Sequence, residues 1–248
     1  MPGLLEGRVA LVTGGARGLG AAIARELAAA GATGSVVDLE AGATPAGWAG
    51  LVADVSVEDT VAAAFAATRE RFRRLDVVVA NAGVVPAWSK TDELDLAQLD
   101  AVFAVNVRGV AATLKHGVAA LRENGGSIVA MASLNAWRAH RSQPVYTASK
   151  HAVLGLIRTA ALDAGRSGIR VNGLAPGPIL TDALRARIER RAAEGGLPVA
   201  DALAEAAAGT ALGRMATEED VARAALFLAS DLSAGITGAL IPVDAGVL

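Results

Sequence analysis

Short, continuously apolar runs alternate along the chain with longer runs rich in alanine and leucine. Apolar runs of about 4–8 residues between turn residues are typical of strands that are buried on both faces of a sheet. The predicted strands are Val9–Val12, Ser35–Val37, Leu51–Ala53, Asp76–Ala80, Ser127–Ala132, Ile169–Leu174 and Ala239–Val243.

The longer runs predict helices over Gly20–Ala30, Val57–Arg73, Leu96–Glu123, Tyr146–Ala164 and Thr217–Ser230. Thr217, with Asp220 three residues later, has the pattern of a capping box. Alternating strands and helices favour one α/β domain over residues 1–248, built on a parallel sheet with helices on both faces. The strandless segment Asp182–Gly213, a helical pair broken near Gly195-Gly196, is interpreted as an insertion that covers a substrate site as a mobile lid.

Composition narrows the class of protein. The 248 residues are 53% hydrophobic and carry a net charge of −2, so the chain can bury a large core and has no basic run typical of a nucleic-acid groove. No uncharged apolar run reaches the ~18 residues of a membrane span, and the first apolar stretch is too short for a signal peptide. A cytoplasmic location is therefore expected. Cysteine is absent and the three histidines lack ligand spacing, so no metal site is predicted.

A glycine-rich turn, Thr13–Gly20, links the first strand to the first helix. Glycines at this position let the backbone approach a pyrophosphate, and the helix N-terminus attracts its negative charge. Asp38 follows the second strand, where a carboxylate would bind the adenosine ribose and repel a 2′-phosphate. Asp38 favours NAD over NADP, whereas Arg17, beside the turn, favours a 2′-phosphate; we give Asp38 the greater weight.

The only tyrosine, Tyr146, stands four residues before Lys150, one of three lysines. This spacing places both side chains on one face of a helix. Pro144 indicates that the helix begins just before Tyr146. Both the neighbouring ammonium group and the helix dipole would lower the pKa of the phenol and favour proton transfer near neutral pH. Taken alone, the pair is equally compatible with an inert surface contact.

Further motifs follow in a definite order. They are Asp54-Val55, Asn81-Ala82-Gly83, Asn106, Ser133, Tyr146-Thr147-Ala148-Ser149-Lys150, Arg170-Val171-Asn172 and the segment Pro176–Thr181. With the glycine turn, they make the chain resemble the NAD(P)-dependent short-chain dehydrogenase/reductase family over essentially its whole length. Ala80 stands where that family usually has a second asparagine. The resemblance implies a Rossmann-like, doubly wound sheet of seven parallel strands.

The resemblance also implies a catalytic tetrad. Tyr146 would exchange a proton with the substrate oxygen and Ser133 would hydrogen-bond that oxygen. Lys150 would bind the nicotinamide ribose and lower the Tyr146 pKa, and Asn106 would hold a water that relays protons from Lys150. The cofactor contacts implied are Gly14, Arg17, Gly18, Leu19, Asp38, Asp54, Val55, Asn81, Ala82, Gly83, Tyr146, Lys150, Pro176, Gly177, Ile179 and Thr181.

The substrate side is less well defined. Candidate pocket residues are Trp88, Leu134, Asn135, Trp137, Val145, Ile179 and Leu184, and the lid arginines Arg185, Arg187, Arg190 and Arg191 are interpreted as a solvated face. A small basic cluster, Arg138, His140 and Arg141, is interpreted as a solvated loop. The leading hypothesis is an oxidoreductase that uses NAD(H) on a small secondary alcohol or ketone.

Three alternatives remain. A 3-oxoacyl thioester reductase would use NADPH, which Asp38 disfavours. An enoyl reductase would space its tyrosine and lysine more widely than Tyr146 and Lys150. A non-catalytic dinucleotide sensor is expected to have lost part of the tetrad. The resemblance further implies a homotetramer built from the long helices near Leu96–Glu123 and Tyr146–Ala164, with a contact through the C-terminal strand.

Overall fold

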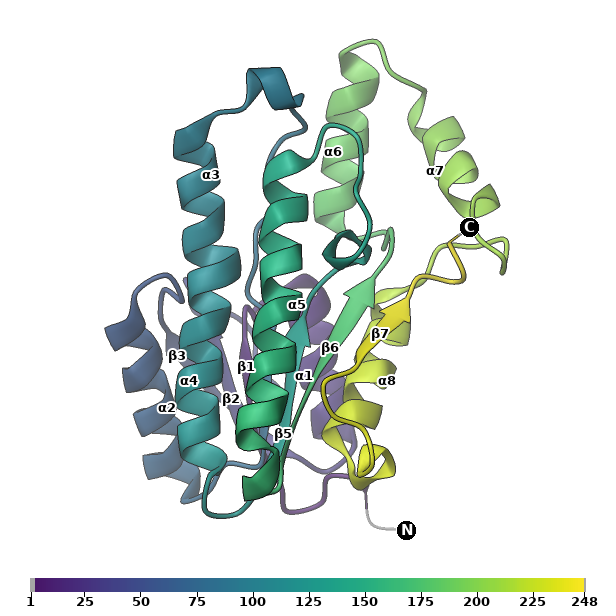
Figure 1. The fold of residues 1–248 in the computed structure, drawn as a ribbon. Coiled ribbons are helices and arrows are strands. Elements are labelled where there is room, and N and C mark those ends of the chain that lie inside the picture. The colour runs from purple at the N-terminus through teal and green to yellow at the C-terminus, as the bar shows by residue number, and fades with distance from the viewer. Residues whose placement is uncertain (1–2, 248) are drawn as a thin grey trace.

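A computed structural model describes residues 3–247 and contains one sheet of seven parallel strands in the order β3-β2-β1-β4-β5-β6-β7 (Figure 1). The strands are β1 Val9–Thr13, β2 Thr33–Asp38, β3 Ala49–Val52, β4 Val77–Ala80, β5 Gly126–Met131, β6 Ile169–Pro176 and β7 Leu240–Val243. The sheet confirms the predicted Rossmann-like class. The strands are wholly apolar where helices cover both faces, as in β4, whose four residues are all buried.

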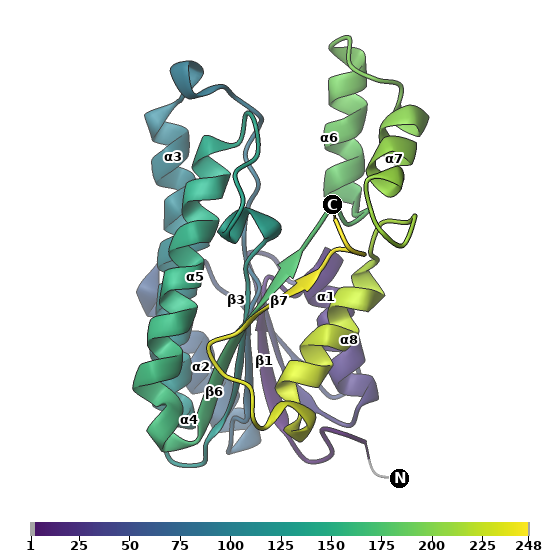
Figure 2. The same ribbon diagram turned by 45° about the vertical axis from the view of Figure 1, so that its right-hand side comes forward.

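Helices form a layer on each face of the sheet (Figure 2). The layer of α1 (Gly18–Ala29) and α8 (Glu218–Ala229) packs on one face, with Ile23, Leu27 and Leu228 in its core. On the other face lie α2 (Glu58–Phe72), α4 (Val110–Leu121) and α5 (Pro144–Ala164). The remaining α-helices, α3 (Leu96–Phe103), α6 (Asp182–Ala193) and α7 (Val199–Ala208), extend past the carboxyl ends of the strands (Figures 1 and 2).

The order of strands reverses between β1 and β4, which are neighbours in the sheet although β2, β3 and α2 separate them in sequence. Their carboxyl ends are in register, with Thr13 opposite Ala80. A reversal of this kind opens a crevice outside the carboxyl ends of the strands, where open α/β sheets bind ligands. The fold therefore places its binding site at the ends of β1 and β4.

One predicted helix differs in detail. The continuous helix expected over Leu96–Glu123 is interrupted by a π-helical turn, Ala104–Gly109, between α3 and α4. Gly109 in that turn touches Val55, since an added Cβ there would lie 2.8 Å from Val55 Cγ2. Apolar periodicity does not distinguish a π turn from an α turn, because one inserted residue changes the helix only locally. By contrast, the capping box at the start of α8 is present as predicted.

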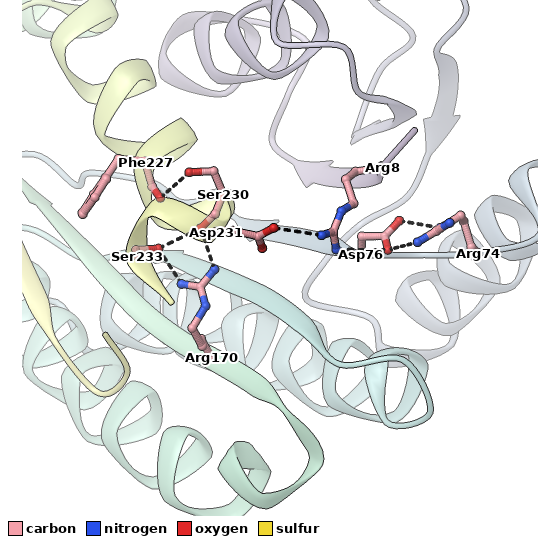
Figure 3. A network of polar contacts seen from close by, with 8 residues as sticks. All are labelled: Arg8, Arg74, Asp76, Arg170, Phe227, Ser230, Asp231 and Ser233. Carbon is pink, nitrogen blue, oxygen red and sulfur yellow. Dashed lines mark hydrogen bonds and ion pairs between the residues drawn. The ribbon is translucent and has the colours of Figure 1, made fainter. Parts of the chain in front are cut away.

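Charged residues form a network of polar contacts at the amino ends of the strands (Figure 3). Asp76, which is 3% exposed, accepts two hydrogen bonds from Arg74, at 2.6 and 2.8 Å, and one from the Val9 amide at 2.8 Å. Arg8 lies 3.8 Å from the same carboxylate and 3.2 Å from Asp231. Asp76 thus joins β1 to β4 at the edge opposite the crevice.

Arg170 forms the second half of this network. Its guanidinium donates to the Ser230 carbonyl at 3.0 Å and to Ser233 Oγ at 2.6 Å (Figure 3). It also donates to the Leu228 carbonyl at 2.9 Å. These bonds attach the C-terminal end of α8 to β6. Arg170, noted in the sequence as part of a family motif, is therefore a structural residue at the amino edge of the sheet.

None of the helices within residues 3–247 is both long and apolar enough to cross a membrane.

Candidate active site

The turn between β1 and α1 is pressed against the loop that follows β4. Gly14 has φ +62°, donates its amide to the Val37 carbonyl at 2.7 Å, and would place a Cβ 2.7 Å from Ala82 Cα. A Cβ on Gly20 would lie 2.0 Å from the Gly14 carbonyl oxygen. Only glycine fits such a close approach. No side chain caps α1, which begins after the exposed Arg17, so its first amides face the crevice without an internal cap. This cradle fits a dinucleotide pyrophosphate.

Asp38 ends β2 beside this turn. Its carboxylate accepts hydrogen bonds from the Ala16 amide at 2.9 Å and the Leu39 amide at 2.8 Å. The carboxylate is thereby held at the edge of the glycine turn, where the adenosine ribose of a dinucleotide would lie. The weak glycine-containing start of β2 does not displace it, because β2 pairs in full register with β1.

Two other predicted cofactor motifs lie along the same crevice. Asp54 Oδ1 accepts from both the amide and the hydroxyl of Ser56, at 2.8 and 2.7 Å. Asn81 Nδ2 donates to the carbonyls of Gly14 at 2.8 Å and Thr13 at 3.1 Å. Thr13 Oγ1 in turn accepts from the Asn81 and Ala82 amides. The Asn81 side chain therefore fastens the two loops together, and Ala82 and Gly83 form the adjoining backbone.

Tyr146 and Lys150 lie on the first turns of α5, which starts at Pro144. Lys150 is 4% exposed, donates from Nζ to the Met131 carbonyl at 2.8 Å, and has Nζ 5.6 Å from the centroid of the Tyr146 ring. Ser133, buried just after β5, accepts from the Asn135 amide at 3.2 Å. The end of β5 and the start of α5 thus bring these three polar side chains to one place.

Burial dominates the electrostatics of this cluster. Burial raises the pKa of the Tyr146 phenol, and the Ser133 hydroxyl and the Arg187 guanidinium only partly offset this. Burial also lowers the pKa of Lys150 to about 8. The expected lowering of the Tyr146 pKa by Lys150 is wrong for the protein alone, because desolvation outweighs it and Lys150 does not contribute to the shift. The cation that acts on Tyr146 is Arg187.

Asn106 is fully buried in the π turn and connects the loop after β4 to α5. It accepts from the Val84 amide at 2.8 Å, and its Nδ2 donates to the Val84 carbonyl at 2.9 Å and to Ser149 Oγ at 3.2 Å. Gly83 lies between it and Lys150: a Cβ there would be 3.3 Å from Asn106 Oδ1 and 3.8 Å from Lys150 Nζ. All four residues of the predicted tetrad are therefore brought together.

The segment after β6 closes the other side of the crevice. Gly177 donates to the Val243 carbonyl at 3.1 Å, and Ile179 forms an isolated bridge with Ala216. Thr181 caps α6, since Oγ1 accepts from the Leu184 amide at 3.1 Å. Pro176, Gly177, Ile179 and Thr181 therefore lie in the segment that leads from β6 into α6.

The structural role of Asn135 was not predicted, since from the sequence it was only a candidate pocket residue. Asn135 Nδ2 donates to Gln143 Oε1 at 2.9 Å and Thr147 Oγ1 at 3.0 Å, which ties the Ser133 loop to the start of α5. Short polar residues in loops carry no periodic signal. Of the proposed pocket residues, Leu134 and Val145 are buried, whereas Trp88 and Trp137 are each 41% exposed.

The solvated face predicted for the arginines of α6 is wrong for Arg187, whereas Arg185, Arg190 and Arg191 are exposed as predicted. Arg187 is half-buried, and its Nε is inaccessible to solvent without a hydrogen-bond partner. Arg191 stacks over the Trp88 ring, 4.5 Å from its centroid, and Trp88 meets His140 at 5.6 Å. The four-residue spacing of Arg187 and Arg191 was a sequence signal that they share one face of α6. The basic loop of Arg138, His140 and Arg141 is exposed, as predicted.

Within residues 3–247, no group of three or more His, Asp or Glu side chains is arranged to hold a metal ion.

Comparisons with known proteins agree with this geometry. A family model described as enoyl-(acyl carrier protein) reductase matches residues 14–248. Short-chain dehydrogenase reductase 3a of Arabidopsis thaliana is 40% identical over 99% of this chain and 97% of its own length. Cis-4-hydroxycyclohexanecarboxylate dehydrogenase of Sinomonas cyclohexanicum is 39% identical over 96% of each chain. The crystal structure of levodione reductase is 35% identical, covers 97% of each chain and has a TM-score of 0.91. The chain belongs to the short-chain dehydrogenase/reductase family, whose members are oxidoreductases that use NAD(P).

Proposed function

We propose that this protein transfers a hydride between NAD(H) and a small secondary alcohol or ketone, with Tyr146 as the general acid and base. The observation that carries the proposal is the convergence of Ser133, Tyr146 and Lys150 at the carboxyl edge of the sheet, beside a glycine cradle shaped for a pyrophosphate. The names of two relatives support the substrate class, since one acts on levodione and the other on a hydroxycyclohexanecarboxylate.

The bound nicotinamide supplies or accepts the hydride, and the protein handles the proton. In ketone reduction, Ser133 holds the carbonyl oxygen and Tyr146 donates its proton to that oxygen as the charge develops. The raised pKa keeps the phenol protonated at neutral pH, which suits this direction. In alcohol oxidation the same phenol must first lose its proton, so oxidation requires a cation nearby or a higher pH.

Lys150 and Asn106 support proton transfer in this proposal. Lys150 is held by the Met131 carbonyl with its ammonium group directed at the tyrosine ring, where a nicotinamide ribose would contact it. The side chain of Asn106 is engaged by Val84 and Ser149, so we assign any proton relay to its backbone carbonyl. A π turn leaves a carbonyl without its usual helical partner, and such turns are frequent at functional sites.

NAD is the proposed cofactor because the Asp38 carboxylate is held beside the glycine turn by two amides. A 2′-phosphate there would meet a fixed negative charge. The same charge disfavours a thioester reductase that uses NADPH. The enoyl reductase named by the family model is disfavoured by the close spacing of Tyr146 and Lys150 on α5, and a non-catalytic sensor by the intact tetrad.

We further propose that α6 and α7 form a lid on a single-domain enzyme, anchored to the opposite loop by the contact of Arg191 with Trp88.

A homotetramer in the cytoplasm is proposed from the family pattern. It is supported by Leu162 on the outer face of α5, which is 83% exposed, and by the open edge of β7.

Tyr146→Phe tests the function directly. The variant removes one oxygen and should lower kcat for NADH-dependent ketone reduction by about 10²- to 10⁴-fold, because general acid catalysis contributes that much. NADH binding, measured by fluorescence titration, should change little. Ala148→Ser, two residues away and exposed, is the control for disturbance of the helix start. Activity in the phenylalanine variant within a few-fold of the parent would contradict the assignment.

A further inference from the structure

Arg187 is a cation without a partner in the lid. It lies in the middle of α6, and its Nε is closed off from solvent yet makes no hydrogen bond to any described residue. The ion pairs found within residues 3–247 do not include it. A buried donor on a charged group destabilises a protein unless something accepts its hydrogen bond. An acceptor is therefore missing at this position.

The other lid arginines are in different surroundings. Arg185, Arg190 and Arg191 are exposed to solvent, and the Arg191 guanidinium also stacks on Trp88. The stack lies one helical turn beyond Arg187 and holds that face of α6 toward the loop after β4. Arg187 therefore lies on the face of α6 that contacts the loop after β4, and it is the one of these four arginines that is half-buried there.

The charge of Arg187 reaches the proposed catalytic phenol. The guanidinium lowers the Tyr146 pKa, and the tyrosine acts in return on the pKa of Arg187, which burial lowers. Arg187 lies on α6, whereas Tyr146 lies on α5 and Ser133 lies in the loop after β5. The helices α5 and α6 stand on opposite sides of the carboxyl ends of the strands (Figure 2). A substrate between them would be held at its reacting oxygen by one wall and at its far end by the other.

We propose that Arg187 binds a carboxylate of the substrate, so that the alcohol or ketone handled by this site is a hydroxy acid or an oxo acid. A guanidinium binds a carboxylate through two parallel hydrogen bonds, which supplies the missing acceptor and fixes the orientation of the ligand. This inference rests on the proposed function and names its substrate class.

The test compares each acid with its uncharged ester. The probes are 4-oxopentanoate and 4-oxocyclohexanecarboxylate, each beside its methyl ester, reduced with NADH by the parent enzyme, Arg187→Gln, Arg187→Lys and Arg185→Gln. The parent should prefer the acids. Arg187→Gln should lose about 10- to 100-fold in kcat/KM on the acids and only a few-fold on the esters, the range typical of a hydrogen bond to a charged group. Arg187→Lys should recover part of the loss, and the exposed Arg185→Gln should behave as the parent.

Two results would overturn the inference while leaving the proposed function intact. Equal losses on acid and ester would mean that Arg187 acts only through Tyr146. A weaker affinity for NADH in Arg187→Gln, with an unchanged preference for acids, would mean that its anion is a phosphate of the cofactor. A second readout does not depend on turnover: both carboxylates should raise the melting temperature of the NAD⁺-saturated parent but not of Arg187→Gln. Equal shifts in the two proteins, or none in the parent, would contradict carboxylate binding.

Discussion

The two edges of the sheet hold their charged residues in opposite ways. At the amino edge, Asp76 and Arg170 are buried or half-buried and their charged atoms are paired with arginine, serine or backbone carbonyls (Figure 3). At the carboxyl edge, Lys150 has a single carbonyl partner and Arg187 has a buried nitrogen with none. The amino edge even has a hollow of about 480 Å³ beside Arg8 and Arg170, yet the charges that line it already have partners.

The contrast indicates that the charged residues of the amino edge stabilise the fold, whereas those of the carboxyl edge serve the proposed function. Paired charges contribute to cohesion, because each buried donor has its acceptor. Unpaired charges weaken the fold and remain available to a ligand, which is a common compromise at active sites. A hollow alone therefore does not indicate a site; unpartnered polar groups beside a glycine cradle are more informative.

The largest stability effect is expected at the amino edge. Asp76→Ala removes the acceptor for Arg74 and for the Val9 amide and should lower the free energy of unfolding by about 3 kcal/mol, because the buried amide loses its hydrogen bond and the half-exposed Arg74 loses its counter-charge. Denaturant unfolding measures this. Asp231→Ala, which removes the other, 86% exposed partner of Arg8, should change stability little. The folded fraction of Asp76→Ala should keep its kcat, and a large loss of kcat there would show that the two edges are not independent.

Substitution of Lys150 is expected to raise the free energy of unfolding, the opposite of the effect of Asp76→Ala. The pKa of Lys150 is about 8 in the folded protein and near 10.5 when unfolded, so the folded state disfavours the charged form. At pH 7 the lysine is protonated in both states, and its burial costs roughly 3 kcal/mol. Lys150→Met should therefore stabilise the protein at pH 7 while abolishing activity. Since the parent gains stability as pH rises from about 8 to 10.5, the advantage of the variant should shrink across that range.

Melting temperatures measured between pH 7 and 10 test this for Lys150→Met and for the control Lys115→Met, whose parent side chain is exposed. A constant advantage at all pH values would mean that methionine only packs better. A loss of stability would mean that the bond from Lys150 to Met131 outweighs the desolvation.

Much of the carboxyl edge could be predicted from the sequence. The glycine turn, Asp38 and Ser133 follow strands, and a parallel sheet gathers the carboxyl ends of its strands at one edge. Tyr146 and Lys150 lie on the first turns of the helix that follows Ser133, so sequence order also brings them to this edge. The direction of the Tyr146 pKa was not predictable in the same way. Spacing places Lys150 near the phenol, but burial depends on every element that packs around the pair.

Long-range partners were also invisible in the sequence. Arg170 bonds to residues about sixty positions away on α8 and the turn after it, and no local pattern encodes such a pairing. Arg187 was misinterpreted because a row of arginines with nearby glutamates is typical of a solvated helix face. Only the structure shows that Arg187 is half-buried and that Arg191, on the same side of α6, contacts Trp88.

The smallest expected effect is a change in cofactor preference on substitution of Asp38. It tests whether the Asp38 carboxylate, at the carboxyl edge of the sheet, acts on the cofactor. Asp38→Asn keeps an oxygen that can accept from the Ala16 amide but removes the charge. Asp38→Ala removes both. If charge repulsion sets the preference, both variants should raise the ratio of kcat/KM for NADPH over NADH by about tenfold, which corresponds to ~1.4 kcal/mol. If Asp38 matters mainly as the anchor of the glycine turn, the alanine variant should weaken both cofactors and the asparagine variant neither. An unchanged ratio in both would show that Asp38 does not contact the ribose, and the exposed Arg17 would then be the residue to examine for 2′-phosphate binding.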